Sequence, residues 1–187
     1  ILNFSKLEAG ELTIEYTTNT IYNVIQQEIN LFIELAQEKQ NTIELVIDNK
    51  IPKYLYLGEM RVGQIIRNLL SNAIKFTENG NIIIKATLSE IVDSSYCIKI
   101  EVIDDGVGIK IEDQKRLFNI FQQLDQSSTK KAKGTGLGLS IAKKLAKLMH
   151  GEIGVQSEIN KGSNFWFTFI AEESKATNLN PVQESIS

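Results

Sequence analysis

The chain has 187 residues, the usual size of one domain and enough for a substantial hydrophobic core. Twenty Lys and Arg against 23 Asp and Glu give a net charge of −3, which argues against a nucleic-acid-binding protein with a globally basic surface. The single cysteine, Cys97, cannot form an internal disulfide, and no apolar stretch reaches the roughly 18 residues of a membrane span. These features favour a cytoplasmic chain without membrane contact of its own. Because the chain does not begin with Met, we also expect an excised fragment, whose parent is either soluble or membrane-anchored.

The first half of the chain predicts alternating helices and strands. Apolar residues at helical spacing end at Gly10, as in the last turn of a helix. Thr20 is a suitable N-cap for an amphipathic helix. The strongest helix signal lies over 59–76, where apolar residues recur at i, i+3, i+4 and i+7. In chain order, we expect the end of a helix over 1–10, a strand over 12–16, a helix over 20–40, a strand over 43–47 and a helix over 59–76.

The second half predicts more strands and ends in a polar tail. Two β-branched runs are separated by Asp93-Ser94-Ser95 and are expected to be neighbouring strands. Residues 122–136 lack apolar anchors and predict a mobile loop. The further elements are strands over 81–92 and 96–103, helices over 113–120 and 137–148, and strands over 152–158 and 163–171. About three long helices and runs of adjacent strands favour an α/β sandwich with the helices on one face of a mixed sheet.

A polar stripe runs along the helix predicted over 59–76. Asn68, Asn72 and Lys75 lie within about 60° of one another around the helix axis, opposite the apolar face. A solvated face is one interpretation. Asn is, however, a poor helix former, so two of them in mid-helix suggest amides with a further role. Their oxygens suit a hard cation such as Mg²⁺, and Lys75 suits a phosphate.

The sequence has two glycine-rich segments, one directly after the strand expected over 96–103 and one at the end of the loop expected over 122–136. Residues 104–109 (DDGVGI) are either an Asp-Gly turn or a close-approach site for a flat ligand. Residues 133–139 (KGTGLGL) run from a loop into a helix, whose N-terminal N–H groups suit an anion. The second segment is neither a P-loop, because no Gly-Lys-Ser/Thr follows, nor a dinucleotide fingerprint, because position 139 is Leu.

In this order and spacing, these segments resemble the motifs of the ATP-binding domain of histidine kinases, in the Bergerat-fold superfamily. The resemblance covers residues 4–171 and implies a two-layer α/β sandwich with a mixed, mostly antiparallel sheet. Residues 3–10 (NFSKLEAG) resemble the end of a dimerisation and phosphotransfer helix. The motifs are the N box over 68–76 (NLLSNAIKF), the first glycine box over 104–108 (DDGVG), the F box over 117–121 (LFNIF), the second glycine box over 134–138 (GTGLG) and the closing box over 162–165 (GSNF).

The resemblance implies roles for the N box and for one aspartate. Asn72 would ligate Mg²⁺, with support from Asn68. Lys75 would contact phosphate, and Phe76 would pack near the adenine. Asp104 would accept a hydrogen bond from the adenine amino group, because a carboxylate only accepts.

It also implies which residues surround the nucleotide. Gly106 and Gly108 would leave room for the base. Residues 122–135 would form a lid over ATP, and residues 136–138 would present N–H groups to the phosphates. The further nucleotide-binding residues expected are Ile109, Phe118, Thr129, Lys130, Lys131, Gly134, Thr135, Gly136, Leu137 and Gly138.

Two positions indicate the reaction. Hydrolytic relatives carry Glu four residues before the Mg²⁺-binding Asn, whereas this chain has Asn68, an amide that cannot act as a general base. This favours phosphoryl transfer over hydrolysis. The only histidine, His150, is followed by Gly151 and suits a helix C-terminus, so it is not expected to be the phosphoacceptor.

We therefore expect a stub over 1–10, an ATP-binding catalytic domain over 11–172 and a disordered linker over 173–187. The domain would bind Mg²⁺ and ATP or ADP and donate the γ-phosphate to a histidine on a separate dimerisation domain, in two-component signalling. The fragment would be monomeric and its parent homodimeric. The lid and tail resemble those of hybrid kinases, which predicts a receiver domain after Ser187 as a response-regulator partner. The alternatives are a degenerate nucleotide-binding scaffold and an ATPase of the same fold.

Overall fold

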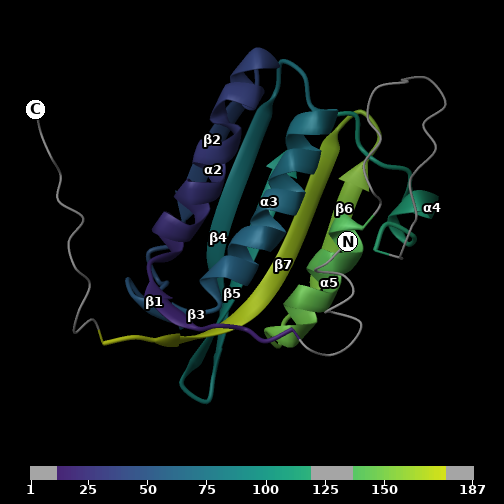
Figure 1. Ribbon diagram of the computed structural model, residues 1–187. Coiled ribbons are helices and arrows are strands. Elements are labelled where there is room, and N and C mark those ends of the chain that lie inside the picture. The colour runs from purple at the N-terminus through teal and green to yellow at the C-terminus, as the bar shows by residue number, and fades with distance from the viewer. Residues whose placement is uncertain (1–11, 119–136, 176–187) are drawn as a thin grey trace, which may run out of the picture.

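The computed structural model describes residues 12–118 and 137–175. Within these residues, seven strands form one mixed sheet, and three long helices cover one of its faces (Figure 1). The helices are α2 (Ile21–Glu38), α3 (Glu59–Phe76), the short α4 (Ile111–Gln114) and α5 (Gly138–Leu148). The strands are β1 (Thr17–Asn19), β2 (Thr42–Ile47), β3 (Leu55–Leu57), β4 (Asn81–Val92), β5 (Ser95–Asp104), β6 (Ile153–Glu158) and β7 (Gly162–Glu173).

The sheet has the order β1-β3-β7-β5-β4-β2, with β6 also paired to β7. Among the strands that the structure describes, only β2 and β4 pair in parallel, and the other pairs are antiparallel. The prediction of a two-layer sandwich with a mixed, mostly antiparallel sheet is confirmed.

The core lies between the helices and the inner face of the sheet. Alternate residues of the central strands point into it, as the period of two requires. On β7 these include Phe167 and Phe169, whose rings stack 6.0 Å apart and are fully buried. The apolar face of α3 is buried against the same layer, which leaves its polar stripe at the surface of the helix layer. Burial of apolar area is the main term that stabilises this arrangement.

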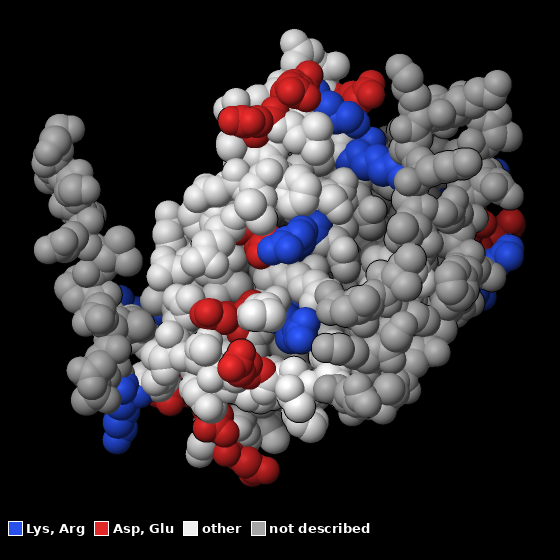
Figure 2. All heavy atoms as spheres, viewed as in Figure 1, with Lys and Arg blue, Asp and Glu red and all other residues white. Residues whose placement is uncertain are grey.

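Figure 2 shows the helix-covered face, on which charged side chains are scattered over largely uncharged atoms. Some exposed apolar side chains belong to α2, including Tyr22 and Leu31. No helix in the described part of the chain is long and apolar enough to cross a membrane.

Most predicted elements are present, with differences in their bounds. The strand expected over 12–16 is wrong, because its first pairing residue is Thr17. Leu12 and Ile14 pack against the core, so their alternation reflects burial without a neighbouring strand. The strand β3 was not predicted, because only Leu55 and Leu57 carry its pattern.

Two other boundaries also shift. The helix expected over 113–120 is α4, which ends at Gln114. Strand β7 continues to Glu173, and the N–H of Ser174 donates to the carbonyl of Tyr54, so the folded part extends past the predicted start of the linker at residue 173. Residues 1–11 and 119–136, with the expected stub and lid, lie outside the described residues.

Candidate functional site

The polar stripe of α3 is half-buried and faces α5 at one end. Asn68, Asn72 and Lys75 are neither fully buried nor exposed. The side-chain amide nitrogen of Asn68 donates to the carbonyl oxygen of Gly138 over 3.0 Å. One end of the stripe on α3 therefore contacts Gly138, the first residue of α5, which the sequence analysis also assigned to the site.

The start of α5 offers uncapped backbone donors. Leu137 is the N-cap residue, and no side chain in the described structure caps this helix end. The first turn has no acidic residue. Because a helix N-terminus carries partial positive charge, this end suits an anionic group. Ser140 fixes the turn by donating from its hydroxyl to the carbonyl of Leu137 over 2.9 Å.

Asp104 is a buried carboxylate at the end of the central strand β5. It pairs with Ile82 of β4 and Ser163 of β7, and is 6% exposed. Burial raises the pKa of Asp104, while backbone N–H groups of Gly106 and Ser163 favour its charged form. The N–H of Gly106 donates to its Oδ1 over 3.0 Å. A carboxylate fixed in this way is an acceptor for a ligand N–H group.

Thr77, which the sequence analysis missed, lies beside Asp104. It follows α3 in extended conformation and is 1% exposed. Among the described residues, this buried hydroxyl oxygen makes no hydrogen bond within the usual distance and angle limits, although it lies near enough to Asp104 to favour the charged form of that carboxylate. Because a buried polar atom without a partner is costly, this hydroxyl marks a place where a ligand or water would bind. The signal was one polar residue directly after the N box.

Gly106 follows β5 in the chain and packs against the backbone at the end of α3. A Cβ atom there would overlap the carbonyl oxygen of Phe76 and would lie 2.8 Å from Thr77 Oγ1 and 2.9 Å from Asp104 Oδ1. The N–H of Val107 donates to the same Phe76 carbonyl over 3.4 Å. Glycine at position 106 thus lets the two segments approach closely.

Gly108 has a structural role beside the one expected. Its φ is +69°, and a Cβ atom would overlap the carbonyl of Glu158 at the end of β6. Glycine is therefore required by backbone packing against β6, in addition to any space it leaves for a base. Ile109 is held nearby, with its N–H donating to the hydroxyl of Ser157 over 2.8 Å.

Of the remaining predicted site residues, the structure describes some, and the others lie outside the described residues. The ring of Phe76 is 44% exposed, and Lys75 Nζ lies 5.0 Å from its centroid. Phe118 is half-buried and packs against the core. Outside the described residues lie Thr129, Lys130, Lys131, Gly134, Thr135 and Gly136.

The last turns of α3 therefore lie between an anion-binding helix end, at the start of α5, and a hydrogen-bond-accepting carboxylate, at Asp104. Asn68 contacts the start of α5, and Phe76 contacts the Gly106 segment beside Asp104. The eight residue steps between them span about 12 Å at the rise of an α-helix. This suits an extended ligand with a hydrogen-bond-donating ring at one end and anionic groups at the other.

Known proteins share this fold and much of the sequence. The chain is 40% identical over 167 residues to the signal transduction histidine-protein kinase BarA of Escherichia coli strain K12, covering 89% of this chain and 18% of BarA. It is 40% identical over 168 residues to the hybrid signal transduction histidine kinase B of Dictyostelium discoideum, covering 90% of this chain and 8% of that kinase. The crystal structure of full-length ShkA in complex with AMPPNP superposes with a TM-score of 0.81 at 30% identity, over 94% of this chain and 35% of ShkA.

The fold and the site define an ATP-binding domain of the type found in sensor histidine kinases. The model of the histidine kinase-, DNA gyrase B- and HSP90-like ATPase family matches residues 58–173, and the chain belongs to this family. It spans less than a quarter of the length of the two kinases compared above.

Proposed function

We propose that this domain binds ATP with Mg²⁺ and donates the γ-phosphate to a histidine on a separate dimerisation domain. The observation that carries the proposal is the connection of a buried carboxylate, Asp104, to an uncapped helix N-terminus at Gly138 through one face of α3. The kinship with named histidine kinases supports the choice of acceptor. The AMPPNP complex of ShkA supports the choice of nucleotide.

The base would lie at the Asp104 end. Its amino group would donate to the Asp104 carboxylate, and the buried Thr77 hydroxyl would bind a ring nitrogen or a bridging water. The exposed ring of Phe76 would pack against the base. Gly106 and Ile109 complete this end from the loop after β5.

The phosphates would lie at the α5 end. N–H groups from Leu137 and Gly138 onward would bind them, and Lys75 would add a positive charge. The residues proposed for the lid, including Lys130 and Lys131, would close over this end. Catalysis would consist of placement and charge neutralisation, as in phosphoryl transfer generally.

Asn72 would hold Mg²⁺ together with the phosphates. The donor set fits this ion, because Mg²⁺ in nucleotide sites takes few protein ligands and shares phosphate oxygens. Among the described residues, no three His, Cys, Asp or Glu side chains gather into a metal cluster. When bound, the ion would neutralise phosphate charge.

The wider assembly is proposed from the same kinship. The phosphoacceptor would be the dimerisation domain of a homodimeric parent, and a response-regulator receiver domain would take the phosphate onward. The dimerisation helix would end within residues 1–10, and the linker would follow β7. We propose a cytoplasmic location for this domain.

The direct test is phosphoryl transfer in trans. The 187-residue chain is mixed with the parent's dimerisation domain and γ-labelled ATP, and acid-labile label on that domain is measured. We expect transfer by the wild type, loss with Asn72→Ala, and no change with the surface control Lys161→Met. Label released as free phosphate with none transferred would favour an ATPase, and an absence of nucleotide binding would favour a scaffold.

A further inference from the structure

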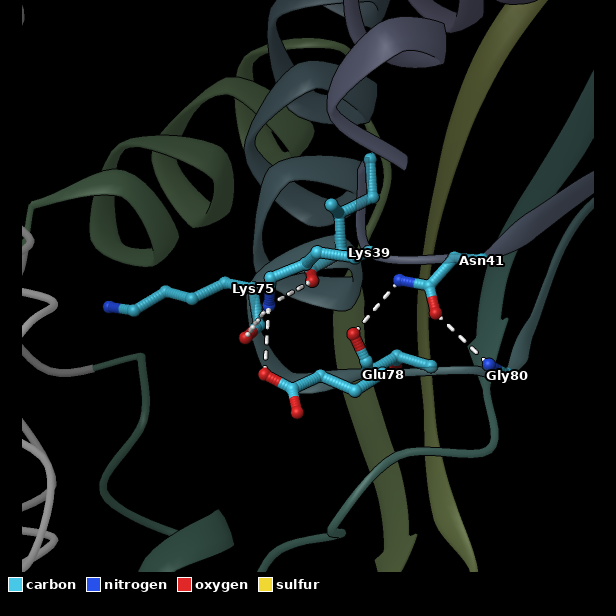
Figure 3. Close-up of polar contacts among 7 residues, drawn as sticks. Lys39, Asn41, Lys75, Glu78 and Gly80 are labelled. Atoms are coloured by element: carbon cyan, nitrogen blue, oxygen red, sulfur yellow. Dashed lines mark hydrogen bonds and ion pairs between the residues drawn. The ribbon is translucent and has the colours of Figure 1, made fainter. Parts of the chain in front are cut away.

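Lys39, at the end of α2, caps the C-terminus of α3. Its Nζ donates to the carbonyl oxygens of Ile74 and Lys75 over 2.9 and 2.8 Å (Figure 3). These carbonyls belong to the last turn of α3, where the helix dipole favours a cation. Glu78, also near Lys39 Nζ at 4.0 Å, is 78% exposed, so this ion pair contributes little. The main contacts of Lys39 are therefore with the backbone of the N-box helix.

Asn41, two residues later, holds the turn that follows α3. It is 6% exposed, and its side-chain amide is satisfied at both ends. Its Nδ2 donates to the carbonyl of Thr77 over 2.9 Å, and its Oδ1 accepts from the N–H of Gly80 over 3.0 Å (Figure 3). A buried amide with both ends bonded fixes the backbone on either side of it.

The fixed turn in turn contacts the segment that carries Asp104. The N–H of Asn81 donates to the carboxylate of Asp105 over 2.9 Å, and a Cβ atom on Gly80 would overlap that carboxylate. Lys39 and Asn41 thus support both segments around Asp104. They bind the backbone at the end of α3 directly, and they support the loop after β5 through the contact between Asn81 and Asp105.

The side chains on this backbone are those proposed to meet the nucleotide. Figure 3 shows the Lys75 carbonyl turned to Lys39 while its side chain extends away. Phe76 and Thr77 come next in the chain, between the contacts of Lys39 and those of Asn41. Fraying of this turn would displace the buried hydroxyl of Thr77 relative to Asp104.

We infer that Lys39 and Asn41 are positioning residues for the nucleobase end of the nucleotide site. They act through the backbone of residues 74–80 and do not touch the ligand themselves. The inference rests on the proposed nucleotide binding and adds two residues from the α2–β2 connection, outside the motifs that define the site.

The test compares variants of the 187-residue chain by calorimetric titration with Mg²⁺ and ADP. Lys39→Met keeps the aliphatic stem but removes the charge and the donors, and Lys39→Arg restores both. Asn41→Ala removes both amide bonds. Ile29→Val, a truncation of a buried side chain next to Glu28, which pairs with Arg67 of α3, lowers stability away from the last turn of α3 and serves as the control. Thermal unfolding identifies a temperature at which every variant is folded.

We expect Lys39→Met to weaken ADP binding about fivefold or more, Lys39→Arg to recover most of the affinity, and Ile29→Val to leave it unchanged. Asn41→Ala, where it folds, should weaken binding at least as much. Wild-type affinity in folded Lys39→Met would overturn the inference while leaving nucleotide binding intact. A wild type that binds no nucleotide would overturn both.

Discussion

The side-chain amide of Asn68 donates a hydrogen bond to the carbonyl of Gly138, 70 residues further along the chain. This bond ties the polar stripe of α3 to the first turn of α5, the two elements proposed to share the phosphates. We expect Asn68→Ala to weaken binding of Mg²⁺-ADP about tenfold, because the bond and one amide are lost. Asn68→Asp should weaken it further, since a carboxylate cannot donate to Gly138 and repels phosphate.

Calorimetry measures both effects. Asn30→Ala, the same change on the exposed side of α2, provides the matched control and should bind as the wild type does. Equal affinities for Asn68→Ala and Asn30→Ala would show that the link between α3 and α5 is irrelevant to the ligand.

Replacement of Asp104 by Asn should raise the free energy of unfolding at neutral pH and weaken ADP binding. Burial raises the pKa of Asp104, so the folded protein holds this proton more tightly than the unfolded chain does. The contribution of this group to stability is therefore present below its unfolded pKa and is lost as pH rises through its raised folded pKa. Asp104→Asn has no such titration, so its free energy of unfolding should rise relative to that of the wild type as pH increases.

Urea unfolding of both proteins between about pH 3 and about pH 7 measures this difference. We expect the difference to grow and then level off, while Asp104→Asn binds ADP more weakly. A difference that stays constant over this range would contradict the raised pKa.

Gly162 should tolerate no side chain. Its φ is +96°, and a Cβ atom would overlap the carbonyl of Asp104. We expect Gly162→Ala to cost about 3 kcal/mol or more, from backbone strain and overlap together. Gly154→Ala is the comparison, since its φ is not positive and its Cβ would meet the ring of Trp166 rather than a backbone atom, so it should cost about 1–2 kcal/mol. Similar losses in the two variants would contradict the backbone explanation.

His150 should be replaceable with a gain in stability. It directly follows Met149, the C-cap residue of α5, has a φ of +59° and is exposed, as expected for the position after a helix C-cap. His150→Gly should stabilise the fold by about 0.5–1 kcal/mol, because glycine adopts this conformation without strain. His150→Ala should give no such gain. Loss of ADP binding in His150→Gly would show that the residue has a role in the site.

The sequence predicted the long elements because each had a strong local signal. The apolar spacing of α3 and the β-branched runs of β4 and β5 are such signals. Leu12 and Ile14 gave a false strand, since alternation shows burial but not the presence of a pairing partner. For β3, three residues are too few to form a pattern.

The supporting residues of the site could not be predicted in the same way. Lys39 and Asn41 lie about 35 residues before the turn that they hold, and only the parallel packing of α2 beside α3 brings them there. The burial of the Thr77 hydroxyl beside Asp104 is not revealed by any residue spacing. Gly108 was predicted as part of the site, but its contact with Glu158 required the sheet to be assembled.

The central claim is that a nucleotide binds with its base at Asp104. Titration of the 187-residue chain with ADP and Mg²⁺, alongside Asp104→Ala, tests it most directly. We predict micromolar binding by the wild type and none by the variant, with both proteins folded by circular dichroism. Undiminished binding by Asp104→Ala would contradict the placement of the base, and no binding by the wild type would contradict the kinase function while leaving the fold as described.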